Sequence, residues 1–129
     1  MKNLRSKVIK YAKMLNSKKL SALRSGNIST RYKDGFFITP SGVKYSSLKS
    51  KDIVFVSLDG EFNRKKGTPS SEWRFHQDIY KNKIEVKAIV HAHSNYATAI
   101  STHGKRIPAF HYMVAMAGGN DIKCAKYAT

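Results

Sequence analysis

The sequence predicts an α/β fold in which helices pack on a mixed, largely antiparallel sheet. Three observations predict this class: an amphipathic helix at the start, a hairpin of two short strands, and an irregular alternation of helices and strands. The chain has 129 residues, the usual size of one domain with a single core. Apolar residues make up 41% and aromatic residues 11%, a composition typical of a folded protein rather than a disordered one.

The first predicted element is an amphipathic helix. Leu4, Val8, Tyr11 and Leu15 recur at the spacing of one helix face, with lysines and arginines between them. The pattern predicts about three helical turns with these four side chains facing the core. The pattern then weakens, and residues 24–27 are expected to form a loop.

Two strands are expected next, at 28–32 and 36–39, joined by a turn at Asp34 and Gly35. Pro and Gly in the segment that follows indicate a second loop, because proline lacks a backbone donor and glycine permits a positive φ. A further strand is predicted at 52–57.

The second half of the chain predicts two helices around one strand. A helix is expected at 71–81 with a serine cap, then a buried strand at 88–93 and a helix at 95–103. The segment 118–120, Gly-Gly-Asn, is expected to be a loop or the end of a helix.

Composition excludes several classes. No apolar run approaches the length of a membrane span, and the charged start lacks the uniform apolar core of a secretory signal. A single cysteine, Cys124, excludes an internal disulfide and fits a reducing compartment. The cytoplasm is therefore the expected location.

The net charge of +16 arises from 24 basic and 8 acidic residues. Such a balance can indicate a nucleic-acid-binding domain, which would release counterions from phosphates. Here the lysines are spread along the chain without a compact arginine-rich block. A basic enzyme that attracts anionic substrates is the preferred interpretation, and nucleic-acid binding stays open as an alternative.

His91 and His93 form the sharpest local feature. Residues i and i+2 of a strand project from the same face, so both imidazoles can reach one point in space. Imidazole is the commonest neutral ligand of zinc. An H-x-H pair is weak evidence by itself, because two histidines at a strand end can equally bond to backbone or water.

Glu72 is the candidate third ligand of a metal. It lies in the first turn of the predicted helix, where the helix dipole favours a carboxylate in any case. The plain alternative is a helix-capping acid without a functional role.

Three short segments could bind an anion. Ser70 and Ser71 open the predicted helix, where hydroxyls and backbone N–H groups face outward. The loops at 26–27 and 41–42 can bring further backbone amides near a phosphate. Each segment alone is more often an ordinary turn, and their value lies in the combination.

The whole set of motifs resembles the class II aldolase and adducin head family, most strongly its L-fuculose-phosphate aldolase branch. The resemblance runs in register from the first helix to the last residue. It rests on seven ordered strings, which together are far more specific than any one of them: GNIS (26–29), ITPSG (38–42), PSSEWRFH (69–76), IVHAH (89–93), IPAFHYM (107–113), AGGN (117–120) and YAT (127–129).

The resemblance implies that Glu72, His91 and His93 bind Zn²⁺ and that Glu72 is also the catalytic base. Tyr112 matches a tyrosine that donates a proton and that a neighbouring subunit of a tetramer supplies in the family. The family's phosphate-binding positions correspond here to Asn27, Ser41, Gly42, Ser70 and Ser71.

The implied fold is a three-layer α/β/α domain, and residues 1–129 are expected to be its N-terminal part, truncated at the C-terminus. The family's third zinc-binding histidine lies beyond the matched strings. His76, His103 and His111 are expected to have structural roles instead. The isolated chain is accordingly expected to bind zinc weakly and to turn over slowly or not at all.

The implied function is a zinc-dependent aldolase that cleaves a short-chain ketose phosphate to dihydroxyacetone phosphate and an aldehyde. A phosphorylated sugar is the expected substrate, and a homo-oligomer is the expected assembly. Two alternatives remain open: a sugar-phosphate dehydratase or epimerase of the same fold, and a non-catalytic remnant or interaction domain.

Overall fold

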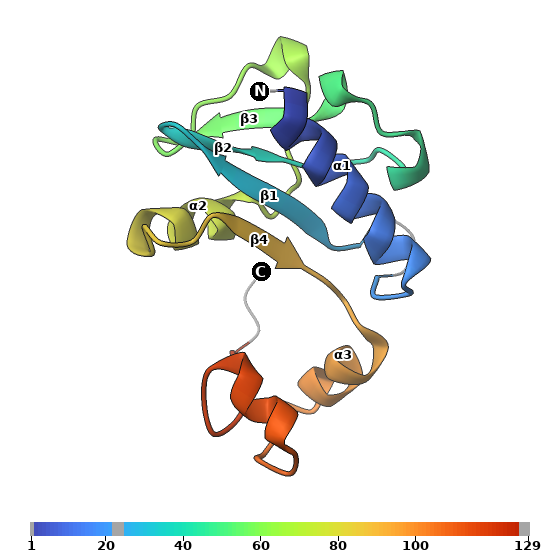
Figure 1. Cartoon of the computed structure of the whole chain (residues 1–129), viewed down its shortest axis with the longest axis vertical. Helices are drawn as coiled ribbons and strands as arrows, with labels where there is room; N and C mark the ends of the chain where they lie inside the picture. Colours follow the sequence, from blue (N-terminus) through green and yellow to red (C-terminus); the bar gives the residue numbers. More distant parts are fainter. Residues whose placement is uncertain (1, 22–24, 127–129) are drawn as a thin grey trace. The chain divides into compact units, whose positions relative to one another are not determined.

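The computed structural model describes residues 2–21 and 25–126 of the chain. The chain divides into two compact units, residues 1–93 and 94–129, and each is described by itself. In chain order (Figure 1), the first unit contains α1 (Lys2–Ser17), β1 (Asn27–Tyr32), β2 (Gly35–Ile38), η1 (Tyr45–Ser47), η2 (Ser50–Asp52), β3 (Val54–Ser57), η3 (Arg64–Lys66), α2 (Trp73–Asn82) and β4 (Ala88–His91). The second unit contains α3 (Asn95–Thr102) and η4 (Tyr112–Ala117).

The four strands form one sheet in the order β3-β2-β1-β4. β1 lies inside the sheet, where Ser29 pairs with Ile38 of β2 on one side and with Ile89 of β4 on the other. β3 pairs with β2 at the far edge. Every pairing among the described strands is antiparallel, which confirms the antiparallel character predicted for the sheet.

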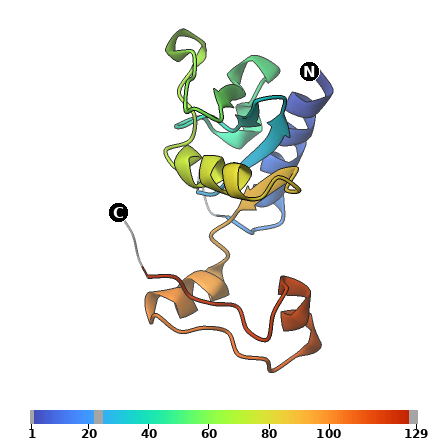
Figure 2. The same cartoon turned by 90° about the vertical axis from the view of Figure 1, so that its left-hand side faces the viewer.

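Helices α1 and α2 cover opposite faces of this sheet, as Figure 2 shows from the side. The alternation of β2 accounts for the layers, because Phe37 packs in one cluster with Val8 of α1 while Phe36 and Ile38 pack in another with Tyr80 of α2. The expected three-layer α/β/α arrangement is confirmed. It places one apolar cluster on each face of the sheet.

Helix α1 is confirmed, but its buried stripe differs from the predicted one. Val8 and Leu15 are buried as expected, whereas Tyr11 is 49% exposed and Ala12 is completely buried in its place. A residue four positions after Val8 lies directly on the same helix face, and the small alanine lets the helix approach the sheet closely. The tyrosine therefore lies at the edge of the stripe.

The β1–β2 hairpin is confirmed, with its turn one residue earlier than predicted. The turn residues are Lys33, which has a φ of 51°, and Asp34, while Gly35 already belongs to β2. A Cβ at Gly35 would lie 2.3 Å from the carbonyl oxygen of Val56 on the neighbouring strand. Glycine is needed at this position for close packing within the sheet rather than for the turn.

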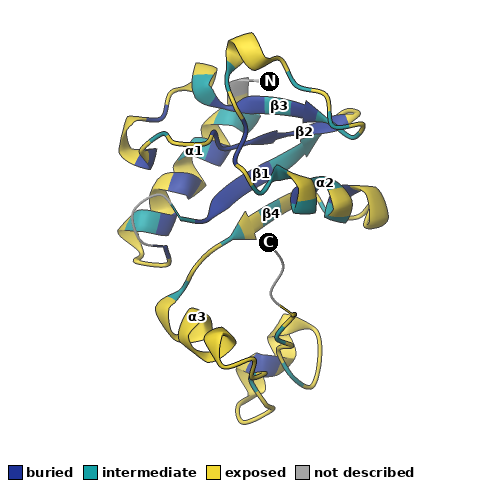
Figure 3. Cartoon of the chain, turned by 180° about the vertical axis from the view of Figure 1, so that it is seen from behind, coloured by how far each residue is buried: buried dark blue, intermediate teal, exposed yellow. Residues whose placement is uncertain are grey.

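The prediction of a buried strand at 88–93 is wrong in its burial and its length. β4 ends at His91 and is the edge strand next to β1. Within the described residues its side chains alternate between exposed and half-buried (Figure 3). Val90 is 60% exposed. A short apolar run predicts a strand, but neighbours in the sheet decide how much of it is covered.

The third predicted strand and the second predicted helix begin later than expected. Residues 50–52 form the 3-10 turn η2, in which the side chain of Asp52 accepts a hydrogen bond from the backbone N–H of Lys49 at 2.8 Å. β3 therefore starts at Val54. Helix α2 starts at Trp73, and residues 71 and 72 form a turn before it.

The second unit is mostly exposed (Figure 3). Its described part contains a bridge between Ile107 and Ile122 and an ion pair between Arg106 and Asp121 at 2.9 Å. The predicted stop at 118–120 is confirmed, since Gly118 ends η4. Among the described residues, no helix combines the length and the apolar character needed to cross a membrane.

Candidate active site

Two loop segments are joined side by side at one end of the sheet. Pro40 and Pro69 form an isolated bridge, the N–H of Ser41 donates to the carbonyl of Thr68 at 3.0 Å, and the N–H of Ser70 donates to the carbonyl of Thr39 at 3.0 Å. These contacts bring residues 39–41 against residues 68–70. The loop after β2 and the residues before α2 therefore form one surface.

His91 and His93 meet at the end of β4. His91 is the last residue of the strand and pairs with Asn27 of β1, while the backbone N–H of His93 donates to the hydroxyl of Ser21 at 3.1 Å. The two Nε2 atoms lie 2.8 Å apart. The two imidazoles meet as predicted and bond to each other, although His93 lies beyond the end of the strand rather than on it.

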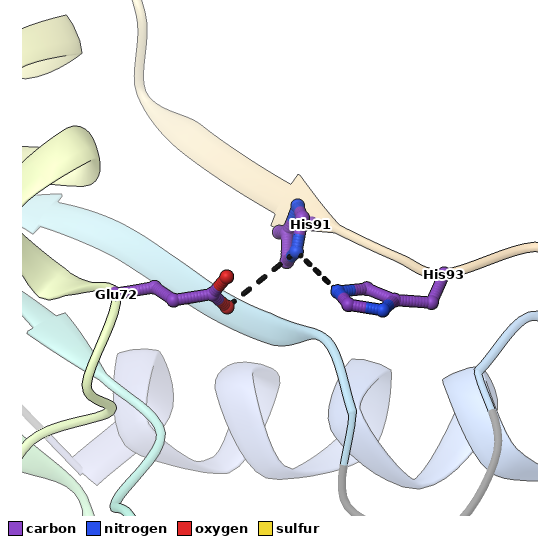
Figure 4. A group of neighbouring side chains, drawn as sticks. All are labelled: Glu72, His91 and His93. Atoms are coloured by element: carbon purple, nitrogen blue, oxygen red, sulfur yellow. Dashed lines mark hydrogen bonds and ion pairs between the residues drawn. The ribbon is translucent and has the colours of Figure 1, made fainter. Parts of the chain in front are cut away.

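Glu72 points at this pair (Figure 4). It occupies the N-cap position of α2, but its side chain makes no capping hydrogen bond. Its Oε2 atom lies 3.4 Å from Nε2 of His91 and accepts a hydrogen bond from Nδ2 of Asn27 at 2.6 Å. The interpretation of Glu72 as a helix-capping acid is therefore excluded, as is the serine cap predicted for this helix.

Glu72, His91 and His93 form a group that could hold a metal ion. One ligand atom from each lies within 4.8 Å of the other two. In a tetrahedral zinc site with bonds of about 2.0–2.1 Å, the ligand atoms are roughly 3.4 Å apart. The separations of 2.8 and 3.4 Å lie near that value, and two imidazoles with one carboxylate are a donor set that a divalent metal such as zinc accepts.

Burial favours the neutral form of His91. It lowers the pKa of His91 below its usual value, an effect that the carboxylate of Glu72 opposes and the neighbouring His93 reinforces. A neutral imidazole is the form that binds a metal. The partly buried position of His91 therefore prepares this side chain as a ligand at neutral pH.

A cavity of about 220 Å³ opens beside this group. Glu72 and His93 both line it, so the cavity and the metal-ligand group share two side chains. The five residues predicted to bind phosphate line the same cavity: Asn27, Ser41, Gly42, Ser70 and Ser71. Segments that lie far apart in the sequence thus meet around one space.

The donors available in this cavity differ from those expected. The backbone N–H groups of Ser41 and Ser70 already donate to carbonyl groups of the neighbouring loop. Ser70 also accepts, through its hydroxyl oxygen, a hydrogen bond from the N–H of Glu72 at 3.4 Å. At Ser41 and Ser70 the hydroxyl protons, rather than the backbone amides, are therefore the groups that can turn towards an anion.

Gly26 borders the cavity and cannot be replaced without strain. Its φ is +77°, and a Cβ at this position would lie 2.6 Å from the carbonyl oxygen of His91. The hydroxyl of Tyr45 donates to the carbonyl of Gly26. This close approach holds the entry to β1 against the strand that carries the histidines.

Sequence reasoning missed the surroundings of Glu72. Asn27 contacts the carboxylate through its side chain, and behind Asn27 lie the buried polar side chains of Ser29, His76 and Tyr80. Their spacing carried a signal, since the two β1 residues are two apart and the two α2 residues are four apart. Polar residues at such buried positions require partners.

The remaining predicted residues lie elsewhere. Tyr112 belongs to the second unit, where it begins η4 with its ring 75% exposed, and its role stays a prediction. His111 caps η4 by accepting from the N–H of Met113 at 3.2 Å, in line with its expected structural role. The motif at 127–129 lies outside the described residues.

Proteins of known function with similar sequences are aldolases that act on phosphorylated sugars. The chain is 48% identical over 126 residues to the 5-methylthioribulose-1-phosphate/5-deoxyribulose-1-phosphate aldolase of Rhodospirillum rubrum, covering 98% of this chain and 57% of the relative. It is 49% identical over 105 residues to the L-fuculose phosphate aldolase of Escherichia coli K12, covering 81% of this chain and 48% of the relative. The chain thus spans about half the length of these relatives.

Solved structures agree with the sequence relatives. An L-fuculose 1-phosphate aldolase superposes with a TM-score of 0.92 at 37% identity, covering 98% of this chain and 60% of that structure. The family model described as "Class II Aldolase and Adducin N-terminal domain" matches residues 6–129. On the fold, the site residues and these matches, the chain belongs to the class II aldolase and adducin family.

Proposed function

We propose that the chain supplies the metal-binding and phosphate-binding part of a class II aldolase that acts on a short-chain ketose phosphate. The observation that carries the proposal is the cavity in which Glu72 and His93 of the metal-ligand group lie beside the serines of two loops. A metal-dependent enzyme that cleaves a sugar phosphate binds the metal and the phosphate next to each other. The relatives named above act on phosphorylated sugars, which supports the same class of substrate.

In this proposal Glu72, His91 and His93 would hold Zn²⁺. When bound, the ion supplies Lewis acidity at the two adjacent oxygens on which negative charge develops during cleavage. His91 offers a ring nitrogen from the last residue of β4, His93 offers one from the segment that follows the strand, and Glu72 offers its oxygen from the start of α2. The spacing of the ligands therefore depends on the packing of α2 against the sheet.

The reaction requires two proton movements. In the direction of aldol formation, the Glu72 carboxylate takes a proton from the carbon of dihydroxyacetone phosphate that becomes the enediolate carbon. That carbon bonds to the aldehyde carbon while Tyr112 donates its proton to the aldehyde oxygen, and exchange with water returns the proton from Glu72 to Tyr112. Cleavage follows the same steps in reverse. By resemblance Tyr112 comes from a neighbouring copy of the chain, so a homo-oligomer is part of the proposal.

The phosphate is held away from the bond that breaks. Hydroxyl groups of Ser41, Ser70 and Ser71 face it, and the loop at Gly42 shapes that side of the cavity. Binding at this remote group positions the reacting carbons near Glu72, which lowers the barrier by orientation. The net charge of +16 attracts such an anionic substrate to the protein.

Release of dihydroxyacetone phosphate tests the proposal. The zinc-loaded protein is assayed with L-fuculose 1-phosphate, 5-deoxyribulose 1-phosphate and 5-methylthioribulose 1-phosphate, using a coupled enzyme that reduces the released ketone. Release is expected from at least one of the three sugars, and Glu72→Gln should reduce the rate by about a hundredfold or more. Glu85→Gln, which changes an exposed acid, is the matched control and should leave the rate unchanged.

Two outcomes contradict the aldolase proposal. Substrate consumption without dihydroxyacetone phosphate would identify a dehydratase or epimerase. No consumption of any sugar, together with equal zinc content in the parent and in His91→Ala, would identify a non-catalytic domain.

A further inference from the structure

A line of buried polar side chains runs from Glu72 into the layer between β1 and α2. Its members are Asn27, Ser29, His76 and Tyr80, each at most 1% exposed. Four polar side chains of this size are costly to bury unless each has a hydrogen-bond partner. Together they connect the candidate metal site to the far end of α2.

The partners follow one another in series. Nδ2 of Asn27 donates to Oε2 of Glu72 at 2.6 Å, and Oδ1 of Asn27 bonds to Nε2 of His76. On the other side of the ring, Nδ1 of His76 lies 2.7 Å from the hydroxyl of Ser29. That hydroxyl lies 2.7 Å from the hydroxyl of Tyr80.

Secondary structure explains the series. Asn27 and Ser29 are two residues apart on β1 and project from the same face of the sheet. His76 and Tyr80 are four residues apart on α2 and share one helix face. When the helix packs on the strand, the two pairs alternate in the order Asn27, His76, Ser29 and Tyr80.

The hydrogen positions in the series follow from its end at Glu72. An ionised carboxylate only accepts, so the NH₂ group of Asn27 must face Glu72 and its oxygen must face His76. Nε2 of His76 therefore carries the proton, and in a neutral ring Nδ1 is then an acceptor. Ser29 donates to Nδ1, which leaves its oxygen to accept from the hydroxyl of Tyr80.

Burial supports the neutral ring. It lowers the pKa of His76 to about 4, with a smaller contribution from His91. Burial also raises the pKa of Tyr80 to about 12, so its hydroxyl keeps its proton. All four hydrogen bonds then point in one direction, each group donating to the next towards Glu72.

We infer that Asn27, His76, Ser29 and Tyr80 are positioning residues that hold the Glu72 carboxylate, through the Nε2–H form of His76, in the orientation that binds the metal. The inference rests on the proposed metal site. His76 prevents the amide of Asn27 from turning its oxygen towards Glu72, where two acceptors would repel each other. Because the hydroxyl of Ser29 donates to Nδ1 of His76 and accepts from Tyr80, these two residues favour the tautomer of His76 with its proton on Nε2.

The first test is the ring form of His76 in the metal-free parent at pH 7. Nitrogen-15 shifts of the ring distinguish a protonated from an unprotonated nitrogen, and His76→Gln identifies the signals by their loss. The expected result is a proton on Nε2 and none on Nδ1. A proton on Nδ1 would reverse the series and overturn the inference.

The second test is zinc affinity, measured by competition with a coloured chelator. Asn27→Leu and His76→Leu should each weaken binding by about tenfold to a hundredfold, the usual effect of losing a group that orients a ligand. Because the two residues act in series, the double variant should bind no more weakly than Asn27→Leu alone. Tyr80→Phe keeps the ring, loses only the distant hydroxyl and should have a smaller effect.

His76→Gln separates positioning from general stability. The glutamine amide can donate to Oδ1 of Asn27 from nearly the place of Nε2, but it cannot restore the bond with Ser29. Zinc affinity should therefore stay near that of the parent in His76→Gln and fall in His76→Leu, although both variants lower the melting temperature. Equal zinc affinity of His76→Leu and the parent would overturn the inference, as would affinities that simply follow melting temperature.

The outcomes also distinguish this inference from the proposed function. A parent that binds no zinc refutes the proposed metal site itself. A parent that binds zinc, with Asn27→Leu binding it equally well, refutes only the positioning role. The ring form of His76 is independent of both metal and substrate.

Discussion

The two faces of the sheet are filled differently. On the face of α1, the buried cluster is apolar and includes Val8, Leu15 and Phe37. On the face of α2, an apolar cluster around Phe36 shares the layer with the buried polar series that ends at Glu72. The same four strands thus support an apolar core on one side and a polar, site-facing layer on the other.

The two faces therefore contribute differently: the α1 face mainly stabilises the fold, and the α2 face also supports the candidate metal site. On the α1 face, burial of apolar side chains stabilises the sheet, and this contribution to the free energy of unfolding does not depend on pH. The α2 face also contains hydrogen bonds whose strength depends on the protonation of one ring. Substitutions on the two faces should therefore differ in what they change.

The largest effect is expected on the apolar face. Phe37→Ala removes a ring that is 1% exposed, stacks on Tyr32 with centroids 5.0 Å apart and lies under the guanidinium of Arg5. The free energy of unfolding should fall by about 3–5 kcal/mol, measured by urea denaturation at pH 7. A fall below 1 kcal/mol would show that this face is not the main core. Under conditions in which the variant stays folded, its zinc affinity should match that of the parent.

A pH-dependent effect is expected on the face of α2. The pKa of His76 is about 4 in the folded chain, mainly because of burial, and its ordinary value is 6.5. Between these values the unfolded chain takes up a proton and the folded chain does not, so acid favours unfolding. The stabilisation is complete above pH 6.5 and is lost as the pH falls towards 4, by about 3 kcal/mol in total.

Denaturation at several pH values measures this loss, and His76→Gln is the control because it removes the titrating ring. The difference in unfolding free energy between the parent and His76→Gln should shrink as the pH falls. A difference that stays constant from pH 7 to pH 4 would mean that the ring titrates normally in the folded chain.

The smallest effect is expected at Tyr11, on the outside of α1. Its spacing from Val8 suggested a core position, but its side chain is 49% exposed and Ala12 is buried instead. Tyr11→Ala should change the free energy of unfolding by no more than about 0.5 kcal/mol in the same denaturation experiment. A decrease of 2 kcal/mol or more would place the tyrosine in the core and restore the stripe predicted from the sequence.

Much of the fold could be predicted because its signals are local. The hairpin, the order of helices and strands and the antiparallel character of the sheet follow from periodicity and turn residues within short windows. The turn at Lys33 and Asp34 was misplaced by one residue, because Gly35 is a turn-forming residue that serves here in packing against Val56. The exposure of β4 could not be predicted, since an apolar run does not reveal whether a neighbour covers it.

The candidate site, too, could be predicted from the sequence only in part. The i, i+2 spacing of His91 and His93 indicated a shared ligand point, and the resemblance to the family added Glu72 and the serines. The hydrogen bonds of Asn27 and His76 were not predicted. Asn27 was assigned to phosphate, which stays a prediction, and His76 was assigned only an unspecified structural role. The structure shows the side chain of Asn27 between Glu72 and His76.

By itself, then, the sequence determined the elements, the residue types available for a metal and an anion, and the family. Only the tertiary structure decided which of those residues meet, because Asn27 and Glu72 are 45 positions apart and touch only when α2 packs on β1. Periodicity describes the faces of one strand or helix, whereas a hydrogen bond between two elements depends on their register and distance. The hydrogen-bonded series that ends at Glu72 forms only through that packing.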